Sequence, residues 1–373
     1  MRKLYFIHCM MFLAGVSHAQ EQYYPRSPWV FANLDARTLA MGDAGLVSTG
    51  PLATYRNPAN LDTFPVFSFG VAKEWRDTIE GNYIGEEDVV FLPHSAGFVV
   101  PGIWQGSLGF LYQKFMKWRV CKTESLLALP YLYEMRSDLS FISLGYRRSI
   151  RPEMELGATL NFTWGKSTVN IQLPEMSDMS YEYNARGASA LISSSVLINE
   201  RVRFALRLLS PTVLWVNEVW AESLESNVTQ EELDYRENIL WEVNGGMEYK
   251  LRESVMLAGQ ITYRDWRRRG GTLVWGDYEF GLNGGFEIQP LEFLILRGGG
   301  YYQLFYDALG FPASELRTVF LTCGIGIRVS SATLDIGIGK SVLVDHVNPE
   351  WIYYPNRFSI LASIHVFPEA LLK

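Results

Sequence analysis

Residues 155–165 read ELGATLNFTWG, and the alternation of their side chains decides the fold. Every second position is apolar, and the positions between are mostly small or polar. Successive side chains of a β-strand point to opposite faces, so the pattern predicts a strand with one apolar and one polar face. Residues 278–288, YEFGLNGGFEI, repeat the pattern with Glu279, Asn283 and Glu287 on the polar face.

The alternation recurs along most of the chain. We expect fourteen strands, at about 66–75, 94–100, 104–118, 139–149, 154–166, 184–198, 202–216, 239–250, 254–266, 276–289, 292–303, 317–328, 331–342 and 357–367. An even number of strands is typical of bacterial single-chain outer-membrane barrels.

The connections alternate between short and long. Tight turns are expected at 101–103, 199–201, 251–253, 290–291 and 329–330. Long loops are expected at 76–93, 119–138, 167–183, 217–238, 267–275, 304–316 and 343–356. Outer-membrane barrels have short turns at the periplasmic end and longer loops at the other. The sequence therefore predicts an all-β, fourteen-stranded antiparallel outer-membrane β-barrel over residues 66–367, in a Gram-negative-type bacterium.

The tryptophans provide a second line of evidence. If the first strand runs outward, seven of them fall at the long-loop end and Trp104 falls at the other. The seven are Trp75, Trp118, Trp164, Trp215, Trp241, Trp266 and Trp275. Indole prefers the headgroup zone of a bilayer, so they predict an aromatic girdle. Scattered core tryptophans are the alternative.

The two ends of the chain are expected to lie outside the barrel. Arg2 and Lys3, the largely apolar stretch 4–16 and the sequence SHA at 17–19 predict a removable signal peptide over 1–19. The last expected strand ends on Phe367, and residues 368–373 form a short tail.

Composition excludes several classes of function. A net charge of −7 gives no basic footprint for nucleic acid. Cys121 and Cys323, the cysteines after the signal peptide, are too few for a disulfide framework. His94, His346 and His365 are scattered without metal-ligand spacing, and no nucleophile motif is present. We therefore expect no metal, no cofactor and no enzymatic activity.

Residues 20–65 fit neither a strand nor a linker. Asp35 is placed to cap a short helix that Gly42 ends, and Asn57 is placed to cap a second turn that starts at Pro58. A barrel of fourteen strands is wide enough to require filling or to leave a channel. We expect this segment to form a plug inside the lumen.

The segment 36–61, ARTLAMGDAGLVSTGPLATYRNPANL, resembles the N-terminal signature of the FadL family of outer-membrane channels, including the PorV/PorQ-like branch. The matching residues are Ala36, Arg37, Met41, Gly42, Ala44, Tyr55, Asn57, Pro58, Ala59 and Leu61. The family often has Trp before N-P-A, where this chain has Arg56. YRDW at 263–266 also resembles a strand end of the family.

The resemblance implies passive uptake of a hydrophobic small molecule, such as a long-chain fatty acid, past a gating plug. Its implied ligand-lining residues are Arg37, Leu39, Met41, Gly42, Tyr55, Arg56, Asn57, Pro58, Ala59 and Leu61. Arg37 or Arg56 would meet a carboxylate, or alternatively pair with an inward acid such as Glu279 or Glu287.

The PorV/PorQ-like branch implies a different role, as an outer-membrane scaffold for protein secretion or surface attachment, and the chain length suits this branch. The expected partners are outer-membrane lipid, a hydrophobic ligand and, in the second role, a secretion-system protein. The acidic stretch 217–238 is either a solvated loop or a docking surface.

Overall fold

The computed structural model describes residues 35–80, 83–126, 129–172, 178–224, 227–239, 241–265, 277–307, 314–346 and 353–368. The short helices are α3 (Ala36–Ala40), η1 (Gly45–Val47), α4 (Ala53–Arg56) and η2 (Pro58–Asn60). The strands are β1 (Val66–Glu80), β2 (Tyr83–Ile103), β3 (Gly106–Leu126), β4 (Leu129–Arg151), β5 (Met154–Gln172), β6 (Asp178–Asn199), β7 (Val202–Leu209), β8 (Thr212–Leu224), β9 (Asn227–Ile239), β10 (Trp241–Arg252), β11 (Val255–Asp265), β12 (Asp277–Leu291), β13 (Leu294–Asp307), β14 (Ser314–Val329), β15 (Ala332–His346) and β16 (Tyr353–Val366).

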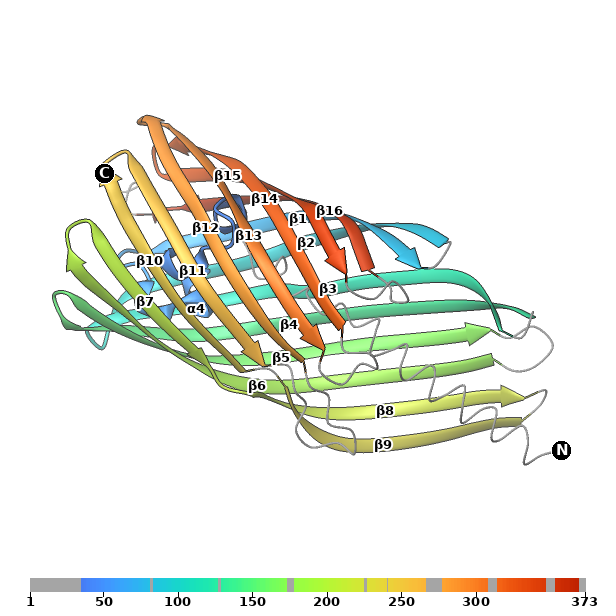
Figure 1. Ribbon diagram of the computed structural model, residues 1–373. Coiled ribbons are helices and arrows are strands. Elements are labelled where there is room, and N and C mark those ends of the chain that lie inside the picture. The colour runs from blue at the N-terminus through green and yellow to red at the C-terminus, as the bar shows by residue number, and fades with distance from the viewer. Residues whose placement is uncertain are drawn as a thin grey trace.

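The strands form one closed antiparallel barrel (Figure 1). The last strand β16 pairs with the first strand β1, with Trp75 opposite Phe358. β7 and β8 form one bent strand along β6, and β9 and β10 pair with them in one continuous register. The barrel therefore has fourteen strands, as the alternation predicts. The pairing of β16 with β1 joins the two terminal strands of the sheet, as a bilayer core requires.

The bend between β7 and β8 lies at Ser210 and Pro211, where the pairing with β6 shifts by one residue. Proline has no backbone N–H and interrupts the ladder. Ser210 compensates in part, because its N–H donates to Ala190 O (2.8 Å) and its Oγ accepts from Ala190 N–H (2.9 Å). Beyond this bend the pair β8–β9 continues past the described end of β11.

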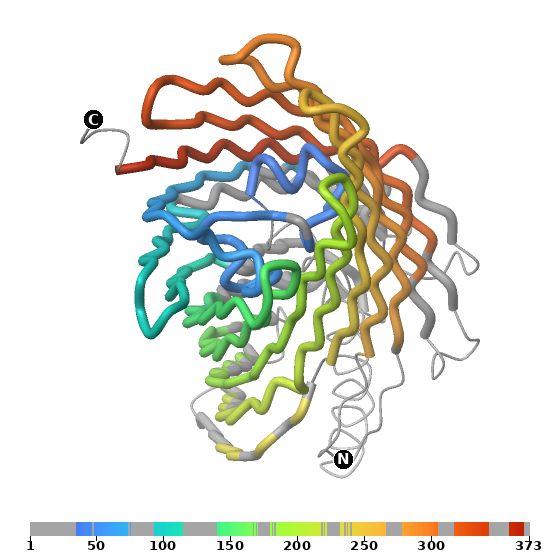
Figure 2. The backbone as a smooth tube through the Cα atoms, turned by 90° about the vertical axis from the view of Figure 1, so that its left-hand side faces the viewer, coloured from blue at the N-terminus to red at the C-terminus, as the bar shows by residue number. Residues whose placement is uncertain are grey.

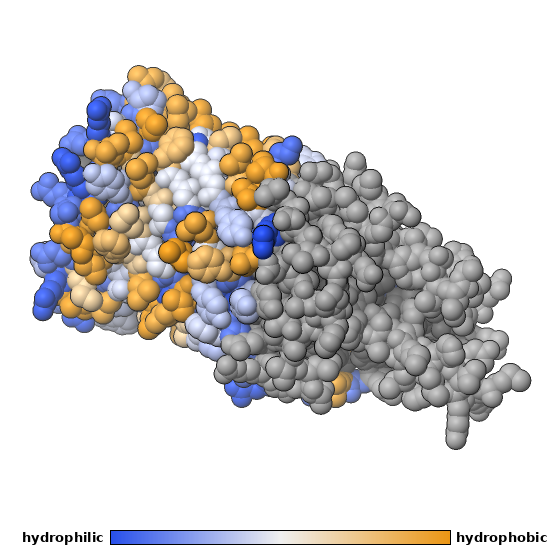
Figure 3. Space-filling view, viewed as in Figure 1, coloured by the Kyte–Doolittle hydropathy of each residue, from blue (hydrophilic) through white to orange (hydrophobic). Residues whose placement is uncertain are grey.

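The predicted faces are confirmed. On β5, Leu160 and Phe162 are exposed and Asn161 is buried; on β12, Leu282 is exposed and Glu279 is buried. The apolar outer stretch of β5 runs over the nine positions from Leu156 to Trp164. A membrane-spanning strand needs about 9–11 residues. Figure 3 shows many apolar side chains over the wall of the barrel and hydrophilic ones gathered at the rim of the short turns.

For four of the predicted long loops the prediction of loop structure is wrong. Residues 76–93, 119–138, 167–183 and the acidic stretch 217–238 are mostly continuations of the flanking strands, which pair in register almost to their tips. The predicted long loop 267–275 and residues 308–313 and 347–352 lie outside the described residues.

The tryptophans with described side chains agree with the predicted girdle. Trp164 and Trp215 point outward and are 39% and 55% exposed, and Trp75 packs on Phe358 with 5.3 Å between ring centroids. Trp104 is 82% exposed at the short-turn end. Trp266 and Trp275 lie outside the described residues.

Cys323 is a free thiol on the outer face of β14. The predicted signal peptide 1–19 and residues 20–34 lie outside the described part of the chain, as do residues 369–373 of the predicted tail. Within the described part, no helix is long and apolar enough to cross a membrane.

Candidate functional site

The segment Asp35–Leu61, here called the helical segment, lies inside the ring of strands (Figure 2). Its first turn forms as the sequence predicts. Asp35 caps α3 by accepting from the Thr38 N–H (2.6 Å), which satisfies a donor that has no partner within the helix. Gly42 follows the helix with φ +66°, a left-handed conformation that favours glycine.

The second turn differs from the prediction. Pro58 does open a short helix, η2, but the Asn57 side chain does not cap it. Asn57 Nδ2 instead donates to Leu46 O (2.7 Å), and Asn60 Nδ2 donates to the same oxygen (2.9 Å). The residues before Asn57 form α4, which the sequence analysis missed. The two asparagines tie the end of the helical segment back to its middle.

Hydrogen bonds join the helical segment to strands all around the wall. Ala40 O accepts from Thr322 (3.2 Å), Leu46 N–H donates to Gln260 (3.0 Å) and Thr54 O accepts from Thr159 (2.6 Å). On further strands, Ala59 N–H donates to Ser193 (3.0 Å) and Leu61 O accepts from Arg147 (2.6 Å). The inward polar face of the barrel therefore supplies hydrogen-bond partners for buried backbone groups of the helical segment.

The turn at Gly42 sits on a patch of bare backbone, here called the glycine seat. The seat consists of Gly284 and Gly285 on β12 and of Gly299 and Gly300 on β13, which face each other in register. A Cβ at Gly299 would lie 2.6 Å from Gly42 N and 2.6 Å from Met41 C. Gly157 on β5 has the same role at the other end, where a Cβ would meet the backbone of Pro58 and Ala59. The segment therefore approaches the wall at distances that only glycine permits.

Both candidate carboxylate-binding arginines are engaged in ion pairs. Arg37 Nε lies 3.1 Å from Glu287, the structural pairing weighed as the alternative above. Arg56 pairs with Asp43 of the same segment at 2.6 Å, and both side chains are buried. The charge of Glu287 raises the pKa of Arg37 above its ordinary value. These pairs hold the segment rather than present a free cation.

A second charged network crosses the inner wall. Glu242 pairs with Arg207 and, at 2.8 Å, with Arg264. Arg264 in turn lies 2.5 Å from Glu279, which also accepts from Gln303 (2.5 Å). All of these side chains are buried. The network links β7, β10, β11, β12 and β13 in one continuous series of hydrogen bonds.

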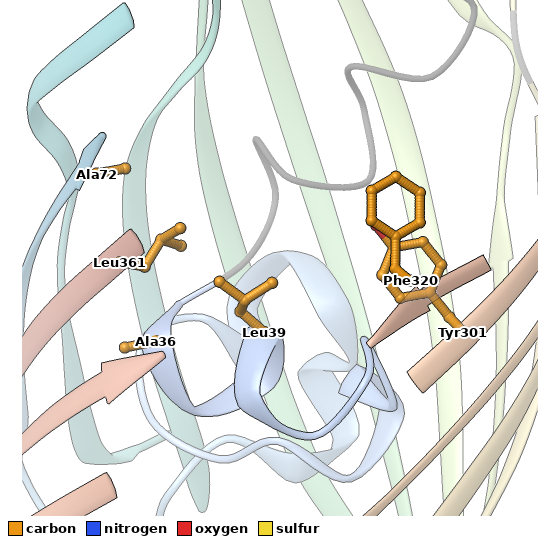
Figure 4. Packing of buried hydrophobic residues seen from close by; sticks show 6 residues of the cluster. All are labelled: Ala36, Leu39, Ala72, Tyr301, Phe320 and Leu361. Carbon is orange, nitrogen blue, oxygen red and sulfur yellow. The ribbon is translucent and has the colours of Figure 1, made fainter. Parts of the chain in front are cut away.

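Apolar inward side chains gather beside α3. This apolar lining consists of Ala36 and Leu39 of α3 with four wall residues: Ala72, Tyr301, Phe320 and Leu361. Figure 4 shows Leu39 between Leu361 on one side and the pair Tyr301 and Phe320 on the other. The two rings stack with centroids 4.4 Å apart.

The other predicted lining residues are not brought together with Leu39. Met41 packs with Ala44 and Ala258. Leu61 packs with Ala53 and Val99. Tyr55 lies against Phe141 at 4.7 Å, under the guanidinium of Arg207. Tyr301, Phe320 and Leu361 were not among the predicted lining residues, because no local pattern in the sequence shows that three separate strands bring them together.

Burial raises the pKa of Asp62, where the helical segment meets β1, to about 6. A hydrogen bond from the Gly50 N–H and the charges of Arg37 and Arg147 oppose this rise. Since the folded-state pKa is raised, the native protein binds more protons than the unfolded chain between about pH 4 and 6. Protonated Asp62 therefore contributes its full stabilisation of the fold below about pH 4. This contribution is lost as the pH rises through about 6.

We therefore expect Asp62→Asn to remove part of the pH dependence of stability. The thermal midpoint in detergent, followed by tryptophan fluorescence from pH 4 to 7, measures it. The difference between the two proteins isolates the contribution of the Asp62 carboxyl. Parallel curves for the parent and the variant would contradict the raised pKa.

Known structures share this architecture. A FadL homologue from Pseudomonas aeruginosa superposes with a TM-score of 0.68 at 10% identity, over 89% of this chain and 98% of that one. The Pseudomonas putida toluene transporter TodX superposes with a TM-score of 0.61 at 12% identity, over 89% of this chain and 97% of that one. This is the FadL-type fold. The monoaromatic hydrocarbon channel CymD has a TM-score of 0.61 at 11% identity, over 90% of this chain and 97% of that one.

The FadL-type fold is shown by structure alone. No family model matches the sequence, and no curated protein matches it either. The FadL-type fold agrees with the fourteen-stranded barrel and with the N-terminal resemblance. By their descriptions, TodX is a toluene transporter and CymD is a monoaromatic hydrocarbon channel.

Proposed function

We propose that the chain is a channel in the outer membrane of a Gram-negative-type bacterium, and that it passes a hydrophobic small molecule. The observation that carries this proposal is the apolar lining. On β14 the inward neighbours of Phe320 are Thr318 and Thr322, and on β16 those of Leu361 are Ser359 and Ser363. Apolar side chains that replace polar neighbours on these two strands supply the surface that a hydrophobic ligand requires.

The FadL-type fold supports the same conclusion, since the similar structures include a toluene transporter and a monoaromatic hydrocarbon channel. A long-chain fatty acid is the ligand we favour. We propose that the helical segment is the plug, and that ligand passage requires it to shift. The Arg37–Glu287 pair and the glycine seat would then hold the closed state.

The proposal is tested by Phe320→Ala with Leu321→Ala as the matched control. The two residues are adjacent, but Phe320 is buried in the lining and Leu321 is 57% exposed on the outer face. Removing a buried aromatic ring costs about 1.5–3 kcal/mol, so we expect binding about tenfold weaker or more in the Phe320 variant only. Equilibrium binding of radiolabelled oleate to the purified protein measures this. Equal affinity in all three proteins would refute the apolar lining as the ligand site.

The structure also favours a second candidate, a scaffold for protein secretion or surface attachment. The pairs β3–β4, β5–β6 and β8–β9 extend as ordered ribbons, and the ion pairs of the helical segment fix it in the lumen. Mass spectrometry of protein purified in mild detergent separates the two roles. A fatty acid lost on Phe320→Ala supports the channel. A secretion-system protein lost when residues 217–238 are replaced by a short turn supports the scaffold.

A further inference from the structure

Tryptophan and arginine alternate across four neighbouring strands of the outer wall. Trp164 on β5 pairs with Arg186 on β6, Arg186 with Trp215 on β8, and Trp215 with Arg236 on β9. Residues directly opposite one another in a sheet share a face and lie about 4.5–5.5 Å apart. Both tryptophans are exposed, and so are both arginines. The four side chains therefore form one row on the outside of the barrel, here called the Trp–Arg row.

The row lines a groove of about 1050 Å³. The next outward position on each strand contributes a polar side chain: Lys166, Asn184, Asn217 or Asp234. On the opposite side of the row the outer face turns apolar, with Phe162 46% exposed. The groove therefore lies where the apolar band of the barrel ends, at the level expected for lipid headgroups.

The charges in the groove are only partly neutralised. Lys166 is paired with Glu182 at 2.5 Å, and Asp234 accepts a hydrogen bond from Asn217 (2.9 Å). Among the residues that the structure describes, neither Arg186 nor Arg236 has an ion-pair partner. Two guanidinium groups, flanked by indole rings, are therefore available to an anion from the bilayer side.

We propose that this groove binds a phosphorylated glycolipid of the outer leaflet. Guanidinium groups bind phosphate oxygens in a bidentate manner, and each basic residue near a bilayer surface strengthens binding of an anionic lipid. Arg186 and Arg236 bind the phosphate. Trp164 and Trp215 lie where the sugar meets the acyl chains, a zone that suits an indole ring with its N–H in water.

Two features indicate that the groove is a specific binding site and not an ordinary part of the outer surface. An aromatic girdle explains the tryptophans but does not require arginine at the positions between them. The long ribbons place the groove at the extracellular end, because the short turns of such barrels are periplasmic. The ligand is therefore expected from the outer leaflet. This inference goes beyond the proposed channel function and does not depend on what passes through the lumen.

The test compares Arg186→Gln/Arg236→Gln with Arg151→Gln/Arg252→Gln. Both variants lose two exposed arginines, but Arg151 and Arg252 lie at the short-turn end. Native mass spectrometry of the full chain in mild detergent measures binding of a bis-phosphorylated lipid A-type glycolipid. At about 1 kcal/mol for each arginine, we expect the Kd to rise about 30-fold in the groove variant and to stay at the parent value in the control.

Comparison ligands identify the source of the phosphate. The glycolipid without phosphates should bind the parent protein as weakly as the phosphorylated form binds the groove variant. Equal binding of the two forms, or equal loss in the control variant, would overturn the proposal. It would also be overturned by phosphatidylglycerol binding as tightly as the glycolipid, or by displacement with inorganic phosphate. Arg186→Lys/Arg236→Lys should recover part of the affinity, since it restores charge without the bidentate geometry.

Discussion

Gly299→Val is expected to displace the helical segment from the wall. The glycine seat leaves no room for a side chain, because a Cβ at Gly299 would lie 2.6 Å from Gly42 N and 2.7 Å from Gly284 O. These atoms belong to backbone on both sides, so neither can rotate away. Overpacking of this kind costs about 1–3 kcal/mol and more where backbone must move. We expect hydrogen exchange in residues 36–47 to increase at least tenfold, which hydrogen-exchange mass spectrometry measures.

Gly245→Val is the matched control. Gly245 lies on the outer face of β10, and a Cβ there would meet nothing within 4 Å. The barrel should fold in both variants. Gel electrophoresis checks this, since unheated folded protein migrates differently from heated protein. If exchange in the helical segment were the same in the two variants, the close approach at the glycine seat would be disproved.

Glu242→Ala is expected to destabilise the barrel itself. Glu242 is 4% exposed and pairs with both Arg207 and Arg264. Its removal leaves Arg264 paired with Glu279, but it takes from Arg207 the carboxylate that its buried guanidinium contacts. Removing one partner of a buried ion pair destabilises a protein by about 3–5 kcal/mol, because the remaining charge is uncompensated. The free energy of unfolding by urea, for protein inserted in lipid vesicles, measures the loss.

Glu182→Ala provides the comparison, since it removes an exposed carboxylate from the pair with Lys166. Exposed pairs contribute about 0–1 kcal/mol, so this variant should unfold close to the parent. A loss for Glu242→Ala no larger than that for Glu182→Ala would mean that water in the lumen screens the network.

The membrane-spanning strands were predictable because lipid forces apolar and polar residues to alternate. Phe162 and Asn161 illustrate this rule, with one exposed and the other buried. The rule fails once a strand leaves the bilayer. In β8–β9, the next outward positions beyond the Trp–Arg row, Asn217 and Asp234, are polar. The sequence there suggests a loop, although the backbone continues to pair.

The candidate site was less predictable because its contacts join residues far apart in the chain. Asp35 and Gly42 were correctly placed, since capping and a left-handed turn are local requirements. The contact of Gly42 with the glycine seat on the wall was not predicted, although the glycines of β12 and β13 stand in the sequence. Nothing local shows that 284–285 and 298–300 pair with each other and then receive a turn from the start of the chain.

The contacts of α3 also constrain the order in which the protein assembles. Thr322 donates to Ala40, 282 residues earlier in the chain, and Arg37 pairs with Glu287 across a separation of 250 residues. The helix α3 therefore lacks its wall partners until β12 and β14 have been made, whereas η2 contacts the earlier strands β4, β5 and β6. Contacts at such separation form late, since the closure entropy of the intervening chain must be overcome first. Barrel closure by β16 and docking of α3 are thus coupled late steps of folding, and an intermediate that lacks the last strands would leave α3 undocked.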